Sequence, residues 1–469
     1  MEDYLSISLT SYGAAGEVTG SKHLLSINDE KYLIDCGAWQ GNQEANQRNR
    51  DFTLPDADKL SGVFLTHAHF DHSGLLPKLV KDGYKGKIYS TPATRDLASI
   101  ILLDSAKIQK YEKPAPAYNE QDVVNTMDYF RCHYYHKKKY VNDNLTFTFY
   151  DAGHILGSSM IDIEVPKKKS LLRKLLKKEN KKLHILFTGD LGRKSNPITN
   201  EPETCMPAPD YIVMESTYGN RLHQSSEVCY TKLEEIINRT IERGGKVIIP
   251  SFAIERAQEI IYNIKLLMRD KKIPKVPVYV DSPMATAATG VFNIHPECFN
   301  KKIVEQFVSQ GKNPFSVRSL HCITDFKDSQ RIAKTDKPCI VIAANGMCEA
   351  GRVINHLKTG LNNPKNTIVV VGYMAENTLV RRILNQEPVV QIEDEDYDLK
   401  AEVVSIDGFS AHADYNEMWR WLRDIDKSKL KKIILVHGDS EAQTALKAFL
   451  ETNGYNVQIA VAEKPIILN

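Results

Sequence analysis

The sequence lacks long apolar runs, paired cysteines and an excess of charge of either sign. No run approaches the roughly 18 apolar residues that a membrane-spanning helix needs, so we expect no membrane partner. The eight cysteines are scattered without a CxxC pair, which excludes a cysteine-type zinc site and favours free thiols in a reducing cytoplasm. Because the net charge is only +2, any binding of nucleic acid must come from local patches.

The first residues also lack the marks of a secretion signal. Met1-Glu2-Asp3-Tyr4 has no basic segment and no apolar core follows it, so we expect no signal peptide and a cytoplasmic location. The length of 469 residues and the hydrophobic content of 42% are those of an ordinary globular protein with two or three domains.

The most informative stretch is His67-Ala68-His69-Phe70-Asp71-His72. It follows an apolar run, residues 61–66, that reads as a strand, and it precedes a helical pattern over residues 75–80. In α/β folds the carboxyl ends of strands form the edge where ligands gather, and imidazole and carboxylate groups are zinc-type ligands. We therefore predict a metal-binding loop; the alternative is a polar surface loop that happens to be rich in histidine.

Further polar side chains follow other predicted strands. They are His154 after residues 141–150, Asp190 after 184–187, Glu215 after 210–214, His412 after 401–406 and His437 after 432–436. With the four polar residues of the central loop, His154, Asp190 and His437 give seven candidate ligands, which are too many for one zinc ion and suit two; Glu215 and His412 are assigned other roles. The assignment is His67, His69 and His154 to one zinc ion, Asp71, His72 and His437 to the other, and Asp190 as the bridge.

Two zinc ions about 3.5–4 Å apart can share a hydroxide and clamp a phosphate, so the predicted reaction is in-line attack on phosphorus. We count Asp71 among the catalytic residues as well as the ligands. A general acid must then protonate the leaving oxygen. His412 is the candidate because it is not needed as a ligand, and Glu215 is placed to pair with it and raise its pKa.

From about Glu227 the pattern changes to strands alternating with helices, which predicts a second α/β domain with a mostly parallel sheet. The expected limits are residues 1–215, 216–400 and 401–469, the last segment returning to the first domain. Arginines near strand-to-helix turns of the second domain suit phosphate binding. The candidate substrate contacts are Ser251, Arg256, Arg352 and Ser410.

Three stretches leave alternatives open. The glycine-rich segment 13–21 is either a tight turn beside the site or a phosphate contact. The basic segment 167–182 is either a solvated extension or a contact for a polyanion or protein. The segment 133–140 mixes aromatic residues with lysines, so it is either an ordinary exposed edge or a surface on which bases stack.

Taken together, these motifs resemble the metallo-β-lactamase fold, and specifically its β-CASP nuclease branch. The HxHxDH loop marks only the superfamily. The more specific stretches lie at residues 215–219, 252–259, 281–283, 346–348, 372–382, 409–412 and 436–438. In these the chain is similar to the endonuclease subunit of the pre-mRNA cleavage and polyadenylation machinery and to its bacterial relatives.

The resemblance implies an αββα sandwich with an inserted β-CASP cap domain, and RNA running between the two domains. It also implies that Glu215, His412 and His437 are the three β-CASP motif residues, and a histidine at the last of these is typical of members that act on RNA. The expected function is endonucleolytic hydrolysis of single-stranded RNA with two zinc ions. A DNA nuclease, a non-catalytic RNA-binding subunit and a homodimeric assembly stay open.

Overall fold

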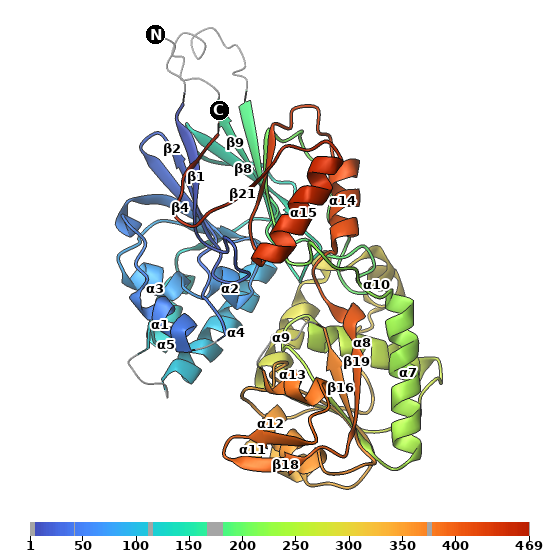
Figure 1. Cartoon of the computed structure of the whole chain (residues 1–469). Helices are drawn as coiled ribbons and strands as arrows, with labels where there is room; N and C mark the ends of the chain where they lie inside the picture. Colours follow the sequence, from blue (N-terminus) through green and yellow to red (C-terminus); the bar gives the residue numbers. More distant parts are fainter. Residues whose placement is uncertain (1–4, 42, 111–115, 167–181, 373–377, 469) are drawn as a thin grey trace. The chain divides into compact units, whose positions relative to one another are not determined.

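The computed structural model describes residues 5–41, 43–110, 116–166, 182–372 and 378–468 (Figure 1). Apart from Lys182, the basic segment 167–182 lies outside the described residues. The chain divides into two compact units. Unit 1 comprises Met1–Lys194, Thr199–Leu222 and His412–Asn469, and unit 2 comprises Ser195–Ile198 and His223–Ala411.

Unit 1 contains two seven-stranded sheets. The first has the order β22-β1-β2-β3-β4-β5-β6, with β1 (Ile7–Gly13), β2 (Lys22–Ile27), β3 (Glu30–Ile34), β4 (Leu60–Phe64), β5 (Ile88–Ser90), β6 (Phe130–Cys132) and β22 (Ile466–Ile467). The second has the order β21-β20-β11-β10-β9-β8-β7, with β7 (Lys139–Asn142), β8 (Leu145–Asp151), β9 (Ser159–Pro166), β10 (Lys182–Phe187), β11 (Tyr211–Met214), β20 (Lys432–Leu435) and β21 (Val457–Ile459).

The sheets pack face to face because alternate side chains on their strands are apolar on the inner face. On β10, Ile185 and Phe187 join the core between the sheets, whereas Leu186 faces outward. That outer face packs against α14 (Tyr415–Asp424) and α15 (Ser440–Thr452), which contribute Trp421 and Leu446. The first sheet contacts α4 (Pro92–Gln109) through β6, and α5 (Glu120–Met127) packs with both α4 and α3 (Leu76–Lys81). These four layers form the αββα sandwich that the sequence led us to expect.

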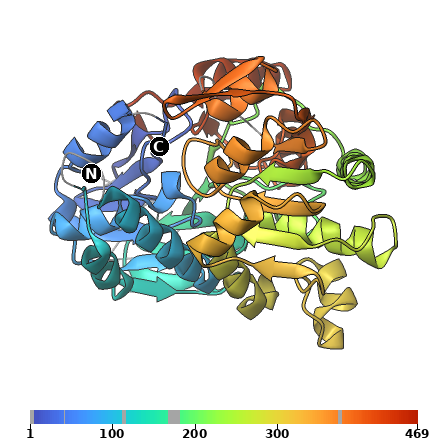
Figure 2. The ribbon, with the colours of Figure 1, turned by 90° about the horizontal axis from the view of Figure 1, so that it is seen from below.

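Unit 2 is built on a six-stranded sheet of order β14-β13-β15-β12-β16-β19, and every neighbouring pair is parallel. Its strands are β12 (Lys246–Pro250), β13 (Val278–Asp281), β14 (Leu320–Cys322), β15 (Cys339–Ala343), β16 (Thr367–Val371) and β19 (Glu402–Ile406). One face carries α12 (Val353–Gly360) and α13 (Leu379–Leu384), and α7 (Ser226–Glu242) lies on the other side of β19 (Figures 1 and 2). This confirms the predicted α/β domain with a parallel sheet.

The limits of the two units differ from residues 215 and 400, the limits expected from the sequence. Strand β19 was expected to begin the segment that returns to the first domain. It instead pairs in parallel with β16 along Thr367–Val371, so the chain leaves unit 2 only after Ala411.

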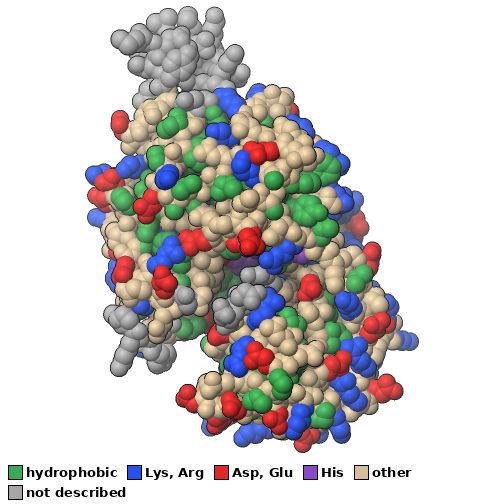
Figure 3. All heavy atoms as spheres, viewed as in Figure 1, with side chains coloured by type: hydrophobic (Ala, Val, Ile, Leu, Met, Phe, Trp, Pro, Cys, Tyr) green, Lys and Arg blue, Asp and Glu red, His purple; other side chains and the backbone are tan. Residues whose placement is uncertain are grey.

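Among the described residues, no helix is long and apolar enough to span a membrane. Figure 3 shows Lys and Arg side chains interspersed with Asp and Glu over the face in view, as the net charge of +2 leads one to expect.

Candidate metal centre

The polar side chains singled out in the sequence meet because of how the strands of unit 1 run. Strands β10, β11 and β20 are parallel, and β8 has the same direction because it is antiparallel to β9, which is antiparallel to β10. The residues that follow the carboxyl ends of these four strands therefore share one edge of the second sheet. They are His154, Asp190, Glu215 and His437. The loop after β4 in the first sheet brings His67 to His72 to the same place.

A first group of ligand atoms has the spacing of a tetrahedral metal site. His69 Nδ1 lies 3.2 Å from both His67 Nε2 and His154 Nε2. Asp190 Oδ2 lies 3.4 Å from each of the same two Nε2 atoms. Four ligands at the zinc distance of about 2.05 Å would be about 3.3 Å apart at the corners of a tetrahedron. One proton on His69 Nδ1 cannot satisfy both neighbouring ring nitrogens, so a cation is the natural partner for this group.

A second group of ligand atoms lies beside Asp190. It consists of Asp71, His72 and His437, whose ligand atoms converge. His72 Nε2 lies 3.3 Å from Asp190 Oδ1, and His437 Nε2 lies 3.5 Å from Asp71 Oδ2. Both Asp190 Oδ1 and His437 Nε2 are buried without a hydrogen bond to any described residue. A buried polar atom in this condition is costly unless something else binds it, and a second metal ion would do so.

A threonine and an aspartate that the sequence analysis missed orient two of the histidines. Thr66 Oγ1 donates to Asp35 Oδ2 over 2.8 Å, so it can only accept the Nδ1 proton of His67, 3.1 Å away. His72 Nδ1 lies 2.7 Å from the same Asp35 oxygen. Both rings are thereby turned so that Nε2 faces the ligand group, which is the usual role of an outer carboxylate around a metal site.

His437 is oriented in the same way by Thr217, which the sequence analysis also missed. The Thr217 hydroxyl donates to the carbonyl of His437 over 3.2 Å and therefore accepts the Nδ1 proton of that ring over 2.9 Å. The glycine-rich segment holds the backbone: His437 N donates to Ala14 O at 2.7 Å, and Gly438 N donates to Glu17 O at 3.2 Å. One role of segment 13–21 is thus to position the last ligand.

The ionisation of the cluster suits a cation. Burial lowers the pKa of His67 well below its usual value and that of His69 to about 4, so both rings are neutral and offer lone pairs at pH 7. Burial alone would raise the pKa of Asp190, but the neighbouring imidazoles, His437 first, hold it well below the usual range. The pKa of His72, lowered by burial, is raised more strongly by Asp190 and Asp35, so a metal ion would have to displace its proton.

The metal loop is fixed by backbone contacts with the turn after β3. Cys36 N donates to His72 O at 2.8 Å, and Ala38 N donates to Phe70 O at 3.0 Å. Between them, a Cβ on Gly37 would lie 1.6 Å from Asp71 O, so no residue with a side chain can occupy this position without moving the loop. In the sequence, Asp35-Cys36-Gly37 follows a strand, as Asp190 does, and this shared pattern could have indicated the contact.

His412 stands beside the ligand groups and pairs with a carboxylate. Its Nδ1 lies 3.1 Å from both Oε1 and Oε2 of Glu215, which is itself fixed by Leu191 N at 2.7 Å. Asp190 Oδ2 is 3.8 Å from the same nitrogen, and the ring centroid is 4.5 Å from that of His154. Burial lowers the pKa of His412, but the charges of Glu215 and then Asp190 raise it to about 9. His412 therefore carries a proton on Nε2 at neutral pH.

The four predicted substrate contacts belong to unit 2 and stay predictions. Ser251 and Ser410 are buried, and Ser251 Oγ donates to Phe252 O at 3.0 Å. Arg352 donates to Asp281 Oδ1 at 2.8 Å and to Thr324 O at 2.6 Å, so its guanidinium also holds this domain together. Arg256 is 7% exposed at the start of α8 (Arg256–Arg269).

Three family models match successive parts of the chain. They describe a metallo-β-lactamase superfamily domain (residues 24–182), a Beta-Casp domain (residues 257–383) and a Zn-dependent metallo-hydrolase RNA specificity domain (residues 396–460). A ribonuclease from Thermus thermophilus is 35% identical over 452 residues, which cover 96% of this chain and 98% of that protein. The chain belongs to the β-CASP family of RNA-processing nucleases. The matched Zn-dependent metallo-hydrolase model and the histidine and aspartate cluster together indicate a metal site.

Other β-CASP proteins match over most of the chain. An RNase J-like protein from Methanocaldococcus jannaschii is 34% identical over 438 residues, 92% of this chain and 93% of its own length. The transcription termination factor FttA from Methanosarcina mazei is 30% identical over 447 residues, 93% of this chain and 67% of that factor. A crystal structure of a protein of unknown function from Enterococcus faecalis V583 shares the fold, with a TM-score of 0.55 and 12% identity, and covers 99% of this chain and all of that one.

Proposed function

We propose that this β-CASP protein is a two-zinc endoribonuclease that hydrolyses phosphodiester bonds of single-stranded RNA. The observation that carries the proposal is that atoms of both ligand groups lie within 3.4 Å of Asp190, with His412 Nδ1 3.8 Å from the same carboxylate. A site with these two features offers metal chemistry and a proton donor at one place, which hydrolysis of a phosphodiester requires.

We keep the division of the seven ligands that the sequence predicts. His67, His69 and His154 would hold one zinc ion, Asp71, His72 and His437 the second, and Asp190 would contribute to both. When bound, the two ions lower the pKa of the attacking water and neutralise charge on the phosphate. Asp35, Thr66 and Thr217 keep the Nε2 atoms of their histidines turned inward, so the site is preorganised and little rearrangement is needed on metal binding.

His412 would act as the general acid. Glu215 accepts the Nδ1 proton, which fixes the ring and favours its charged form, and the proton on Nε2 is the one given to the leaving oxygen. Glu215 is too deeply buried, at 1% exposure, to contact the substrate itself, so it is a positioning residue that acts through His412.

The choice of RNA rests on the relatives and on His437. The Thermus relative is named a ribonuclease and the matched C-terminal model an RNA specificity domain. A histidine at position 437 is also the residue typical of RNA-acting family members. Internal cutting is the part of the proposal that the named relatives leave open, and it needs a substrate without ends.

The test uses a circular single-stranded RNA, its linear 5′-labelled form and the matching DNA, each with zinc-loaded protein. Because a circle has no end, only an endonuclease can open it. We expect wild type to open circular RNA. His412→Ala should lose at least about 100-fold in rate, the usual minimum for a general acid, while it keeps two zinc ions per chain. The control His321→Ala should match wild type.

Each alternative has its own outcome. Faster cutting of DNA than of RNA would assign the protein to the DNA-acting nucleases. Degradation of linear but not circular RNA would make it an exonuclease. Two bound zinc ions without cleavage of any of the three substrates would contradict the catalytic proposal and favour an RNA-binding subunit.

A further inference from the structure

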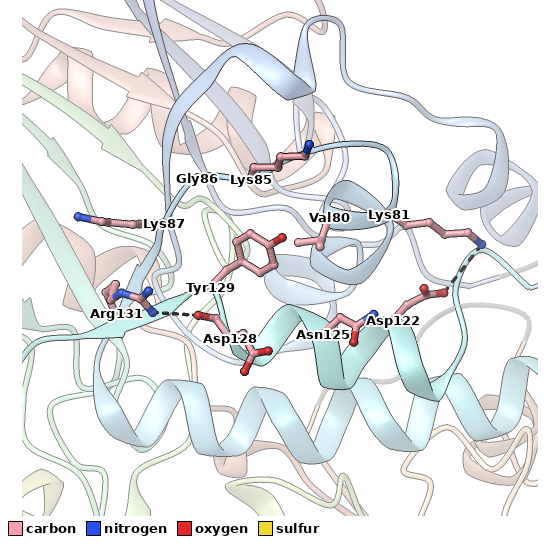
Figure 4. Close-up of a pocket in the computed structure, with 10 residues that line it drawn as sticks. All are labelled: Val80, Lys81, Lys85, Gly86, Lys87, Asp122, Asn125, Asp128, Tyr129 and Arg131. Carbon is pink, nitrogen blue, oxygen red and sulfur yellow. Dashed lines mark hydrogen bonds and ion pairs between the residues drawn. The ribbon is translucent and has the colours of Figure 1, made fainter.

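A basic pocket lies on unit 1 away from the metal centre (Figure 4). It has a volume of about 620 Å³ and lies between α3, α5 and the turn that leads into β5. Its charged lining consists of Lys81, Lys85, Lys87, Arg131, Asp122 and Asp128. Four cations against two carboxylates give the pocket a positive balance, although the chain as a whole is nearly neutral.

Two of these cations are available to a ligand. Lys81 Nζ lies 3.9 Å from Asp122 and donates to Ala117 O at 3.2 Å. By contrast, the ammonium groups of Lys85 and Lys87 make no hydrogen bond or ion pair with any described residue, and Figure 4 shows both extending away from the other side chains drawn. Both residues are exposed.

The lysine and tyrosine segment 133–140, which the proposed function of the metal centre does not use, begins two residues after Arg131 of the pocket. Arg131 lies on β6, and the chain passes from there through residues 133–140 to β7 at the edge of the sandwich. On this segment Tyr134 and Tyr140 are 62% and 65% exposed, unusually open for rings of this size. His133, the first residue of the segment, stacks on Tyr89 of β5 with ring centroids 6.0 Å apart, and burial, Lys139 and Lys87 lower its pKa.

The pocket is separate from the metal centre. Lys87 directly precedes β5, which is parallel to β4, so the pocket lies at the amino ends of these strands. The loop with His67 follows the carboxyl end of β4, at the opposite end of the sheet. Segment 133–140 follows the carboxyl end of β6, which is parallel to β5, so it leads from the strands beside the pocket toward that opposite end.

Exposed tyrosines interleaved with cations are the chemistry of single-strand binding, because rings stack on bases of any sequence while the cations follow the phosphates. We propose that Lys85, Lys87, Arg131 and the segment 133–140 form a second binding surface for single-stranded RNA, which holds the strand outside the metal centre. The inference rests on the proposed function for the identity of the polyanion. It predicts that long RNA binds more tightly than RNA that fills only the metal centre.

The test measures binding of labelled single-stranded RNAs of 6 and 30 nucleotides to zinc-loaded protein in a His412→Ala background, so that binding is read without cleavage. We call the proposed second binding surface the strip, and the strip variant is Lys85→Glu/Lys87→Glu. The matched control is Lys429→Glu/Lys464→Glu, which makes the same change of charge on exposed lysines of unit 1. A third variant, Tyr134→Ala, tests stacking.

We expect the strip variant to weaken binding of the 30-mer by about tenfold and to reduce its salt slope by about 1.4, that is 0.7 for each lost phosphate contact. Tyr134→Ala should weaken the 30-mer by about fivefold or more, the loss of one stacked base. Binding of the 6-mer should be unchanged in both. Crosslinking of a 4-thiouridine 30-mer to the peptide 133–140 would locate the strand directly.

The inference is overturned if the strip variant binds the 30-mer as the control does, or if both lengths lose affinity equally. A wild-type protein that binds the 30-mer through the strip but cleaves no RNA would overturn the proposed function and leave this inference standing. A protein that cleaves RNA, but whose binding of the 30-mer is the same in the strip variant as in the control, would support the proposed function and overturn this inference.

Discussion

Replacing Glu215 by glutamine should shift the pH dependence of cleavage without removing a metal ligand. Glutamine has the size of glutamate and keeps a carbonyl oxygen for the Nδ1 proton of His412, which lies 3.1 Å from both carboxylate oxygens. The change removes the charge, and the amide nitrogen also replaces an oxygen that accepts from Leu191 N or Thr217 N. If His412 is the general acid, activity requires its protonated form and falls as pH rises through its pKa.

The size of the effect follows from the two charges beside the ring. Burial lowers the pKa of His412, yet Glu215, the larger influence, and Asp190 raise it from 6.5 to about 9. The net shift corresponds to about 3 kcal/mol in favour of the charged form, after the opposing effect of burial. Since a raised pKa keeps the acid form present to higher pH, loss of Glu215 must move the alkaline limb of the kcat/KM profile downward. We expect the pKa of this limb to fall by at least about one unit, which lowers the rate about tenfold at pH values above it.

The assay is the pH profile of kcat/KM for RNA cleavage at equal zinc content, from pH 5.5 to 9.5. In metal-free protein, titration of His412 by NMR should give a pKa near 9 in wild type and a value lower by more than about one unit in Glu215→Gln. The control is Glu203→Gln, since Glu203 pairs with the exposed His136 at 2.7 Å. A Glu215→Gln profile lowered by one constant factor at every pH would refute the reasoning, because it would mean that the protonation of His412 does not limit the reaction.

Three further changes test the structure around the metals. Asp35→Asn keeps the backbone, because asparagine tolerates the φ of 61° at this position, but it removes the charged partner of His72 Nδ1. Zinc affinity at the second site, measured by zinc titration, should therefore fall about 10- to 100-fold, while the melting temperature changes little. Gly37→Ala puts a Cβ 1.6 Å from Asp71 O and should lower the free energy of unfolding, measured in denaturant, by at least about 1–3 kcal/mol. An unchanged midpoint of the denaturation curve would show that the loop can move. Phe147→Ala, in the dry core between the sheets, should cost about 3–5 kcal/mol in the same assay without changing the zinc stoichiometry.

The ligand positions could be anticipated because they depend on a local pattern. Asp190 and His437 each follow a short apolar run, and a sheet brings the carboxyl ends of strands with the same direction to one edge. The structure places these side chains within 3.3–3.5 Å of neighbouring ligand atoms, although they are far apart in the sequence.

The residues that orient the ligands could not be anticipated in this way. Asp35 also follows a strand, but its bond to His72 depends on a left-handed backbone and on the contact between two loops. Thr217 orients His437 because its hydroxyl contacts both the Nδ1 atom and the carbonyl oxygen of that residue. The sheet to which β19 belongs is likewise decided by its neighbour β16 and not by its own apolar pattern. Such features arise from tertiary contacts, which a single sequence does not display.

The measurement that tests the central claim most directly is a zinc titration of metal-free protein, read by the opening of circular single-stranded RNA. If the two ligand groups share Asp190 and act together, opening should stay near background up to one equivalent of zinc and rise between the first and second equivalents. Asp190→Asn, which removes the charge of the shared carboxylate, should abolish the rise. Full activity at one equivalent, or a rise that survives in Asp190→Asn, would contradict the account of a two-metal ribonuclease.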